Sequence, residues 1–326
     1  MEEAKVTDSG YLRTFFEVVR CGSFSKAADI LCVTQSAVSR RIKLLEEQYG
    51  CRLIDRSGAV LKPTEAGSIM YEKAFQMLEL ESALDKQLQE LNERPVLAFA
   101  CTRPFGCAYL PAILKRYMAR YEGKADFHLS METPPRALQG LRDNEFDLVV
   151  LEHWENIDFA PFTTVGLGTD TMVFVSAPSL GLSSPEISVD DLIPHRLYRR
   201  KEDCCSGKLL AHNMAAIGRD PREFGNVFLF DDLHVIIESV VAGEGIAFIS
   251  RCLVQSHLEE GRLREHRVAG FSHERRRTLA YRQQNGRSEA FRYFLTCILE
   301  SFGIADDGST SPEPREATAR RKKKSA

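Results

Sequence analysis

The clearest group of side chains with a chemical role lies in residues 23–50, where small polar and basic residues gather at the start of a predicted helix. Short polar side chains let a helix approach base edges closely, and Gln and Arg can each bind a base edge through two hydrogen bonds. Basic side chains beside them neutralise backbone phosphates. The predicted DNA-contacting residues of this stretch are Ser23, Thr34, Gln35, Ser36, Ser39, Arg40, Arg41 and Lys43. In the alternative interpretation, these residues form an ordinary helix face that contacts only solvent.

Two short helices that meet at a tight turn must position this group. Residues 24–31 predict the first helix, in which Ala27 and Ala28 allow a second helix to pack closely. Residues 35–49 predict the second helix, with Thr34 as its N-cap. Its predicted inward stripe is Ala37, Val38, Ile42, Leu45 and Tyr49. Caps, turn and stripe together are typical of a helix-turn-helix and favour DNA binding over a solvated face.

A β-hairpin is predicted directly after these helices, in residues 51–62. Two short apolar runs flank Ser57-Gly58, which is a typical turn sequence. The hairpin would form a wing beside the two helices. Arg56 and Lys62 would then lie near the DNA backbone or the minor groove.

A long helix follows, with Thr64 as its N-cap and residues 65–92 as its span. Its apolar positions are Met70, Ala74, Met77, Leu84, Leu88 and Leu91, and Leu80 lies beside Glu81 where the stripe is interrupted. Apolar residues spaced alternately three and four positions apart predict that this helix pairs with the same helix of a second chain. Pairing would place two recognition helices about one turn of DNA apart. Packing against the chain's own second domain is the alternative, and Arg94-Pro95 predicts the end of the helix.

The composition of the chain narrows the class of protein. A length of 326 residues predicts two or three domains, and a net charge of −3 means that DNA binding must depend on a local basic patch. We expect a cytoplasmic protein without a membrane span, because the N-terminus is polar and no apolar run is long enough. Nine scattered cysteines and eight histidines show no metal-ligand spacing, so neither a metal nor a cofactor is expected.

From residue 96 onward, short apolar runs alternate with helical patterns. The order β-α-β-α-β predicts a parallel sheet with helices on both faces. A second unit of the same kind follows, and the last strand and helix return to the first. The pattern predicts two lobes joined by two crossovers, lobe I in about residues 95–163 and 268–302 and lobe II in about residues 164–267.

Ligands of such sheets bind beyond the carboxyl ends of the strands. The predicted effector-binding residues are Thr102, Arg103, Thr133, Pro134, His153, Arg200 and Lys201. The cations Arg103, Arg200 and Lys201 indicate an anionic effector such as a carboxylate. In the alternative interpretation, Thr102 is merely a helix cap and the arginines are solvated.

Cys204-Cys205 is the one cysteine pair with a possible reactive role. Both lie in a basic segment, YRRKEDCCSGK, where neighbouring cations would favour the thiolate. A thiol-based redox sensor is therefore an alternative function, although adjacent cysteines form a strained disulfide.

The segment AADILCVTQSAVSRRIKLLEEQYGCRLIDRSGAVLKPTEAG closely resembles the N-terminal signature of the LysR-type transcriptional regulators. The matching residues are Ala27, Ala28, Leu31, Thr34, Gln35, Ser36, Ala37, Val38, Ser39, Ile42, Leu45, Glu46, Gly50, Leu53, Arg56, Thr64, Ala66 and Gly67. Ile54 stands where the family has Phe, and Lys62-Pro63 extends the wing. ESVVAGEGIAFISRCLV resembles a second family stretch, with Glu244 and Ser250 as departures.

The resemblance implies an α/β two-lobed, periplasmic-binding-protein-like effector domain, preceded by an all-α-rich winged helix-turn-helix and a long linker helix. The expected domains are residues 1–63 (DNA-binding), 64–94 (linker and dimerisation helix), 95–302 (effector-binding) and 303–326 (a disordered tail with a basic end). By the same resemblance, Thr102 and Thr133 occupy positions where family members hold an effector through hydroxyl groups.

We therefore expect a transcriptional regulator that binds double-stranded DNA and a small-molecule effector. The expected assembly is a homo-oligomer, either a dimer or a tetramer, with RNA polymerase as a further partner. An enzyme fused to a helix-turn-helix is a rival from another class, but the sequence shows no nucleophile elbow, phosphate loop or metal triad. An architectural DNA-binding protein is a second rival, and it would not need a two-lobed pocket.

Overall fold

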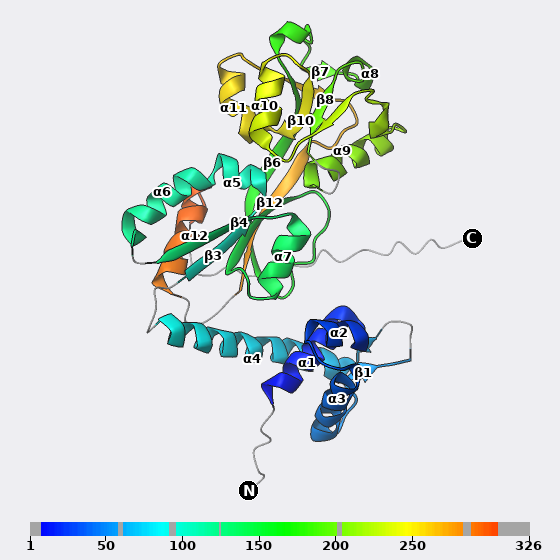
Figure 1. Ribbon diagram of the computed structural model, residues 1–326, viewed down its shortest axis with the longest axis vertical. Coiled ribbons are helices and arrows are strands. Elements are labelled where there is room, and N and C mark those ends of the chain that lie inside the picture. Colours follow the sequence, from blue (N-terminus) through cyan, green and yellow to red (C-terminus); the bar gives the residue numbers. More distant parts are fainter. Residues whose placement is uncertain are drawn as a thin grey trace, which may run out of the picture. The chain divides into compact units, whose positions relative to one another are not determined.

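The computed structural model describes residues 8–57, 61–90, 96–123, 125–200, 204–282 and 288–305 (Figure 1). The chain divides into an N-terminal unit that ends at Glu93 and a C-terminal unit that begins at Arg94. Predictions for Gly58, Leu91, Arg94-Pro95 and Lys201, and for the tail beyond residue 305, lie outside the described residues.

The N-terminal unit has the predicted helical order followed by a small hairpin. Its elements are α1 (Ser9–Cys21), α2 (Phe24–Ile30), α3 (Gln35–Tyr49), β1 (Ile54–Asp55), β2 (Lys62–Pro63) and α4 (Glu65–Glu90). The predicted caps are confirmed: Ser23 Oγ accepts the N–H of Lys26, and Thr34 Oγ1 accepts the N–H of Ala37. Gly50 ends α3 with φ 69°, a conformation that suits glycine.

The core of this unit forms where α1, α2 and α3 meet. Ala27 and Ala28 are buried, which confirms the close helix contact predicted for them. The inward residues Val38, Ile42 and Leu45 are also buried. Tyr49 was predicted to point inward, and this prediction is wrong: its side chain is 41% exposed, because the core ends at Leu45, one turn earlier.

Helix α4 packs on α1 through its first half. Phe16 stacks on Tyr71 with ring centroids 4.7 Å apart, and Ala74 is buried. Farther along, four apolar side chains remain about half exposed in the single chain, namely Met77, Leu80, Leu84 and Leu88. Within the described residues the second half of the predicted stripe is therefore not covered by this unit.

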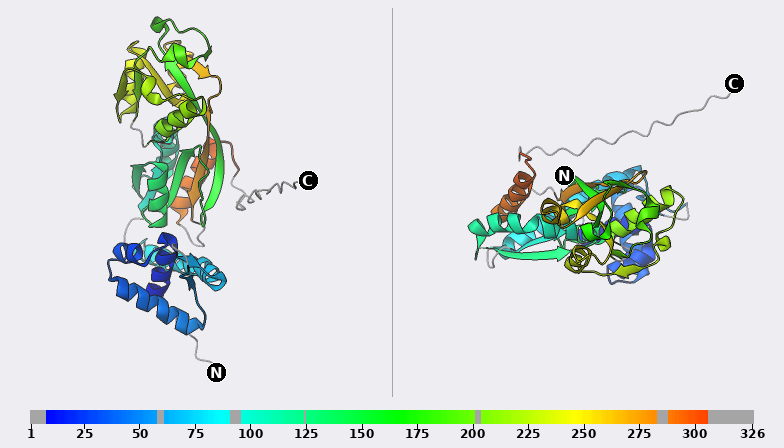
Figure 2. Two further views of the ribbon diagram at one scale, coloured as in Figure 1. Left: turned by 90° about the vertical axis from the view of Figure 1, so that its right-hand side faces the viewer. Right: turned by 90° about the horizontal axis from the view of Figure 1, so that it is seen from above.

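The C-terminal unit is built on one continuous sheet with the strand order β4-β3-β5-β12-β6-β10-β8-β9. Figures 1 and 2 show its strands and the helices around them. Its strands are β3 (Val96–Cys101), β4 (Asp126–Met131), β5 (Leu148–His153), β6 (Thr163–Ser176), β7 (Glu186–Ile187), β8 (Leu197–Arg199), β9 (Val227–Leu229), β10 (Ile246–Ser250), β11 (Arg264–Val268) and β12 (Glu274–Tyr281). Its helices are α5 (Arg103–Ala108), α6 (Leu110–Tyr121), α7 (Pro134–Arg142), α8 (Val189–Leu192), α9 (Cys205–Ala216), α10 (Leu233–Val241), α11 (Arg251–Glu259) and α12 (Glu289–Ser301).

The sheet forms two lobes, each with its own parallel strands. In lobe I, β3 pairs in parallel with β4 and β5, and in lobe II, β8 pairs in parallel with β9 and β10. The long strands β6 and β12 connect the lobes. Strand β6 pairs with β12 as far as Thr171 and with β10 from Met172 onward, so the chain changes lobe at this point of one strand.

Candidate functional site

The first turns of α3 present the predicted DNA-contacting side chains on an exposed face. Gln35, Ser36, Arg40 and Lys43 are exposed, and Ser39 is half-buried. A groove beside them is lined by Ser39, Arg40, Lys43, Glu46, Arg52, Ile54 and Arg56. The structure therefore brings together the polar start of the helix and a set of cations from α3 and the segment that follows it.

Arg41 is placed differently from Arg40. Its guanidinium Nη1 donates a hydrogen bond to Thr14 Oγ1 on α1, at 3.1 Å. Arg41 thus links α3 to α1 instead of extending from the exposed face. Ser23 and Thr34 use their hydroxyl groups to cap α2 and α3.

Arg56 is held against α3 by Glu46. Its Nη2 lies 3.2 Å from Glu46 Oε2, and its guanidinium carbon lies 5.3 Å from the centre of the Phe24 ring. Glu46 also accepts the N–H of Leu53 at 2.9 Å, so the same carboxylate fixes the hairpin to the helix. Lys62 is exposed on β2.

A cavity of about 210 Å³ lies between the two lobes of the C-terminal unit. Most of the predicted effector residues line it, namely Thr102, Arg103, Thr133, Pro134 and Arg200, together with Cys204 and Cys205. They come from the ends of β3 and β4 in lobe I and from the segment between β8 and α9 in lobe II. The structure thus gathers these side chains at one site, as the topology predicted.

His153 was predicted at this site, but it does not line this cavity; it lines a neighbouring cavity of the same unit instead. Its ring is buried, with Nε2 2.9 Å from Thr278 Oγ1 and Nδ1 2.9 Å from the carbonyl oxygen of Glu155. Successive side chains of a strand point to opposite faces, so the preceding residue, Glu152, lies on the side of the cavity instead.

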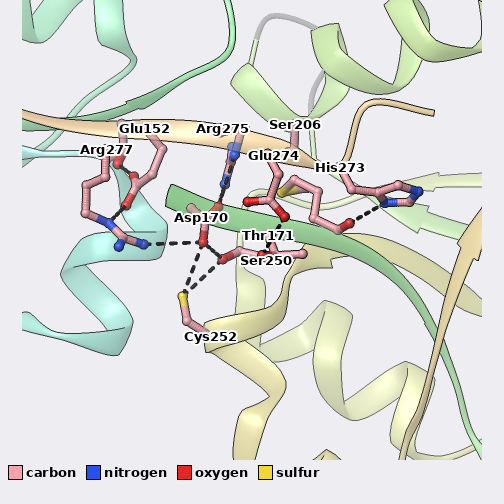
Figure 3. Close-up of polar contacts among 12 residues, drawn as sticks. Glu152, Asp170, Thr171, Ser206, Ser250, Cys252, His273, Glu274, Arg275 and Arg277 are labelled. Atoms are coloured by element: carbon pink, nitrogen blue, oxygen red, sulfur yellow. Dashed lines mark hydrogen bonds and ion pairs between the residues drawn. The ribbon is translucent and has the colours of Figure 1, made fainter. Parts of the chain in front are cut away.

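Next to the cavity, four buried charged residues form what we call the crossover ion cluster: Glu152, Asp170, Arg275 and Arg277 (Figure 3). Arg275 donates to Asp170 Oδ2 from Nη2 at 2.5 Å and from Nε at 3.1 Å. Arg277 donates from Nε to Glu152 Oε1 at 2.9 Å and reaches Asp170 from Nη2 at 3.4 Å. Two cations are thereby matched by two carboxylates, as buried charges require.

The cluster touches the interlobe cavity at several points. The hydroxyl of Thr102 donates to Glu152, and the hydroxyl of Ser250 donates to Asp170 (Figure 3 shows the second contact). Thr102, Ser250 and Arg275 all line the cavity. Thr102 is not merely a cap, because its side chain makes no capping hydrogen bond to α5.

Burial sets the protonation of the groups around the cluster. It raises the pKa of Glu152 to about 7, and the neighbouring Arg275 and Arg277 offset this only in part. Burial likewise raises the pKa of the Cys252 thiol to about 11, assisted by the charge of Asp170.

The two vicinal cysteines are free thiols with structural contacts. Cys204 is buried, and its Sγ accepts the N–H of Gly207 at 3.3 Å as the N-cap of α9. Burial raises the pKa of Cys205 despite the nearby Arg275. The neutral thiol is therefore favoured at Cys205, which argues against the redox alternative.

Sequence reasoning missed Glu152, Asp170, Arg275 and Arg277. A signal was present: Glu152 directly follows the apolar run 148–151, and Arg275 and Arg277 are two residues apart in a strand that ends in the apolar run 279–281. Charges on one face of a buried strand indicate an internal ion pair.

The part of the chain that the structure describes contains no group of three or more His, Cys, Asp or Glu side chains arranged to hold a metal ion. None of its helices combines the length and the apolarity needed to cross a membrane.

Comparisons with known proteins agree with this architecture. The chain is 28% identical over 255 residues to a glycine cleavage system transcriptional activator homolog of Haemophilus influenzae, covering 77% of this chain and 80% of that protein. It is 27% identical over 289 residues to the uncharacterized HTH-type transcriptional regulator YeiE of Escherichia coli strain K12, covering 87% of this chain and 94% of that protein.

Solved structures show the same fold. Full-length LysG of Corynebacterium glutamicum, described with arginine bound as effector, has a TM-score of 0.54 at 19% identity, covering 91% of this chain and 98% of that chain. ArgP of Mycobacterium tuberculosis has a TM-score of 0.54 at 21% identity, covering 92% of this chain and 99% of that chain.

Two family models match the chain in succession. Residues 10–68 match the bacterial regulatory helix-turn-helix protein of the lysR family, and residues 92–303 match the LysR substrate binding domain. The chain therefore belongs to the LysR family of transcriptional regulators, with an N-terminal helix-turn-helix and a C-terminal effector-binding domain.

Proposed function

We propose that this regulator binds DNA as a homo-oligomer and that an anionic effector, a small carboxylate, binds between its lobes. The observation that carries the proposal is the charge of the interlobe cavity. Besides Arg275, which Asp170 already pairs, its lining contains three arginines, Arg103, Arg199 and Arg200, and two carboxylates, Glu132 and Asp231. The excess of cations favours an anion.

Several donors in the cavity are available to such an anion. Arg103 forms no ion pair with any described residue, and the buried Nε–H of Arg200 has no hydrogen-bond partner there. The Thr133 hydroxyl makes no capping hydrogen bond to α7. A carboxylate that accepts hydrogen bonds from these groups would pair the buried Nε–H of Arg200, and a buried donor without a partner lowers the stability of the fold.

On the DNA side, we propose that Gln35, Ser36, Ser39, Arg40 and Lys43 contact the major groove and its phosphates. Arg56 and Lys62 of the hairpin would contact the backbone or the minor groove. Arg41 has a structural role between α3 and α1. The half-exposed apolar side chains of α4 would pair with a second copy, which sets the distance between two recognition helices.

The effector would act by binding one arrangement of the lobes more tightly than another, which is the requirement for any ligand-driven switch. RNA polymerase is the partner through which such a regulator would act, in the cytoplasm. No catalytic role is proposed, since the charges of the crossover ion cluster are paired with one another.

Isothermal titration of the purified full-length protein tests the effector proposal. The probes are small mono- and dicarboxylates, each with its uncharged amide as a control. We expect saturable binding of at least one acid, a loss of about tenfold or more in Arg200→Gln, and no binding of the matched amide. Equal binding of an acid and its amide would contradict an anion site.

A further inference from the structure

A second cavity, of about 440 Å³, lies next to the effector cavity in the C-terminal unit. Its lining includes Leu138 and Arg142 of α7, Trp154 and Ile157 of the segment after β5, and Lys208 of α9. Helix α7 belongs to lobe I and α9 to lobe II, so a molecule in this cavity would touch both lobes.

The inner surface of this cavity suits a flat or branched apolar group. Trp154 is the single tryptophan of the chain and is half-buried, with its ring centre 4.4 Å from that of His212 on α9. Leu138 is buried and Ile157 is half-buried. An indole beside aliphatic side chains is a favourable surface for an aromatic or branched hydrocarbon.

The rim of the cavity carries two cations, Arg142 and Lys208, and two carboxylates, Glu155 and Asp158. Within the described residues neither Arg142 nor Lys208 forms an ion pair; Arg142 Nη2 donates to the backbone carbonyl of Asp158 at 3.3 Å. The Asp158 carboxylate accepts the N–H of Ala160 at 3.0 Å, and Glu155 is exposed. Lys208 also lies in the first turn of α9, where the helix dipole favours negative charge.

We propose that this cavity is a second ligand site, which takes a small carboxylic acid with an aromatic or branched apolar body. The acid group binds at the Arg142 and Lys208 rim, and the apolar body packs on Trp154 and Ile157. This site is separate from the interlobe cavity, whose arginines it does not share.

The two cavities are joined by a common wall. Pro134 and Cys205 line both of them. A ligand that moves this wall, or fixes α7 against α9, therefore changes the shape of the interlobe cavity. Given the proposed effector site, occupancy of the second cavity alters the affinity of the first, and the coupling is reciprocal.

Fluorescence of Trp154 in the full-length protein tests the site directly, because this residue is the chain's single tryptophan. The probes are phenylacetate and cyclohexanecarboxylate, with phenylacetamide as the uncharged control. We expect a saturable change in emission with either acid and none with the amide. Arg142→Gln and Lys208→Gln should each weaken binding by about tenfold.

Two further variants test whether the fluorescence response comes from binding in the second cavity. Ile157→Phe fills the cavity and should abolish the response, while Lys115→Gln, at an exposed lysine of α6, should leave it unchanged. Thermal unfolding of each variant shows that the fold is retained. The proposal is overturned by an absent response in the wild type, or by a response of equal affinity in Ile157→Phe and Arg142→Gln. The effector proposal is tested separately, by the loss of calorimetric binding in Arg200→Gln, because Arg200 lines the interlobe cavity and not the second cavity.

Discussion

Arg275 stands directly opposite Asp170 where the two strands between the lobes pair, and its guanidinium donates two hydrogen bonds to one carboxylate oxygen of Asp170. The same arginine lines the interlobe cavity. A ligand in the cavity would therefore reach the strands that join the lobes through one side chain. Figure 3 shows the contacts of Arg275 and Asp170 between these strands.

Replacement of Thr102 by Val should weaken effector binding. The change removes a hydroxyl that lines the cavity and also donates to Glu152. We expect a loss of about five- to twentyfold in affinity for the acid found by calorimetry, which corresponds to one hydrogen bond. Thr169→Val, at an exposed position of β6, is the control and should bind normally. Full affinity in Thr102→Val would remove this residue from the effector site.

The stability of the C-terminal unit should depend on pH through Glu152. Its pKa is raised to about 7 in the folded protein, above the ordinary value near 4.5, so folding takes up a proton between these values. The resulting stabilisation is complete below about pH 4.5 and is lost as the pH rises through about 7. The difference is on the order of 1–3 kcal/mol in the free energy of unfolding.

Urea unfolding between pH 5 and 8 measures this dependence. Glu152→Gln cannot titrate and should flatten the profile. Glu145→Gln, which changes an exposed carboxylate paired with Arg136, should keep the wild-type profile. The assignment fails if Glu152→Gln retains the full pH dependence.

Arg40 and Arg41 are neighbours in the sequence, but their substitutions should have different effects. Arg40→Ala should weaken DNA binding by about 1–3 kcal/mol and reduce the salt dependence by about one phosphate contact, with little change in stability. Arg41→Ala should instead lower the free energy of unfolding by about 1 kcal/mol, because it removes the hydrogen bond to Thr14. Equal effects of both changes on DNA affinity and on stability would contradict the two roles.

The apolar side chains of α4 should hold the oligomer together. Leu84→Glu combined with Leu88→Glu places charges on two half-exposed apolar positions and should yield monomers at micromolar concentration. Ser68→Glu adds a charge at an exposed polar position of the same helix and should leave the oligomer intact. Analytical ultracentrifugation distinguishes the outcomes, and an unchanged mass in the double variant would exclude this stripe as the interface.

The features that depend on nearby residues could be predicted from the sequence. The caps at Ser23 and Thr34 and the glycine stop at Gly50 follow from local backbone chemistry. The residues after the first two strands of lobe I were also found, because parallel strands end at the same edge. His153 was misplaced because strand alternation decides which of two adjacent side chains faces a cavity.

The crossover ion cluster could not be predicted in the same way. Asp170 and Arg275 are paired by the register of two antiparallel strands that lie 105 positions apart in the chain. That register is set by the packing of both lobes, which no local pattern of residues specifies. The second cavity depends in the same way on how α7 and α9 approach each other.

The central claim, that a carboxylate between the lobes controls DNA binding, is tested most directly by fluorescence anisotropy on a bound site recovered by genome-wide footprinting. The affinity of the wild type and of Thr102→Val for this site is measured with and without the acid identified by calorimetry. The account predicts that the acid changes the DNA affinity of the wild type several-fold and leaves that of Thr102→Val nearly constant at the same concentration. An equal change in both proteins, or no change in the wild type at saturating acid, would contradict it.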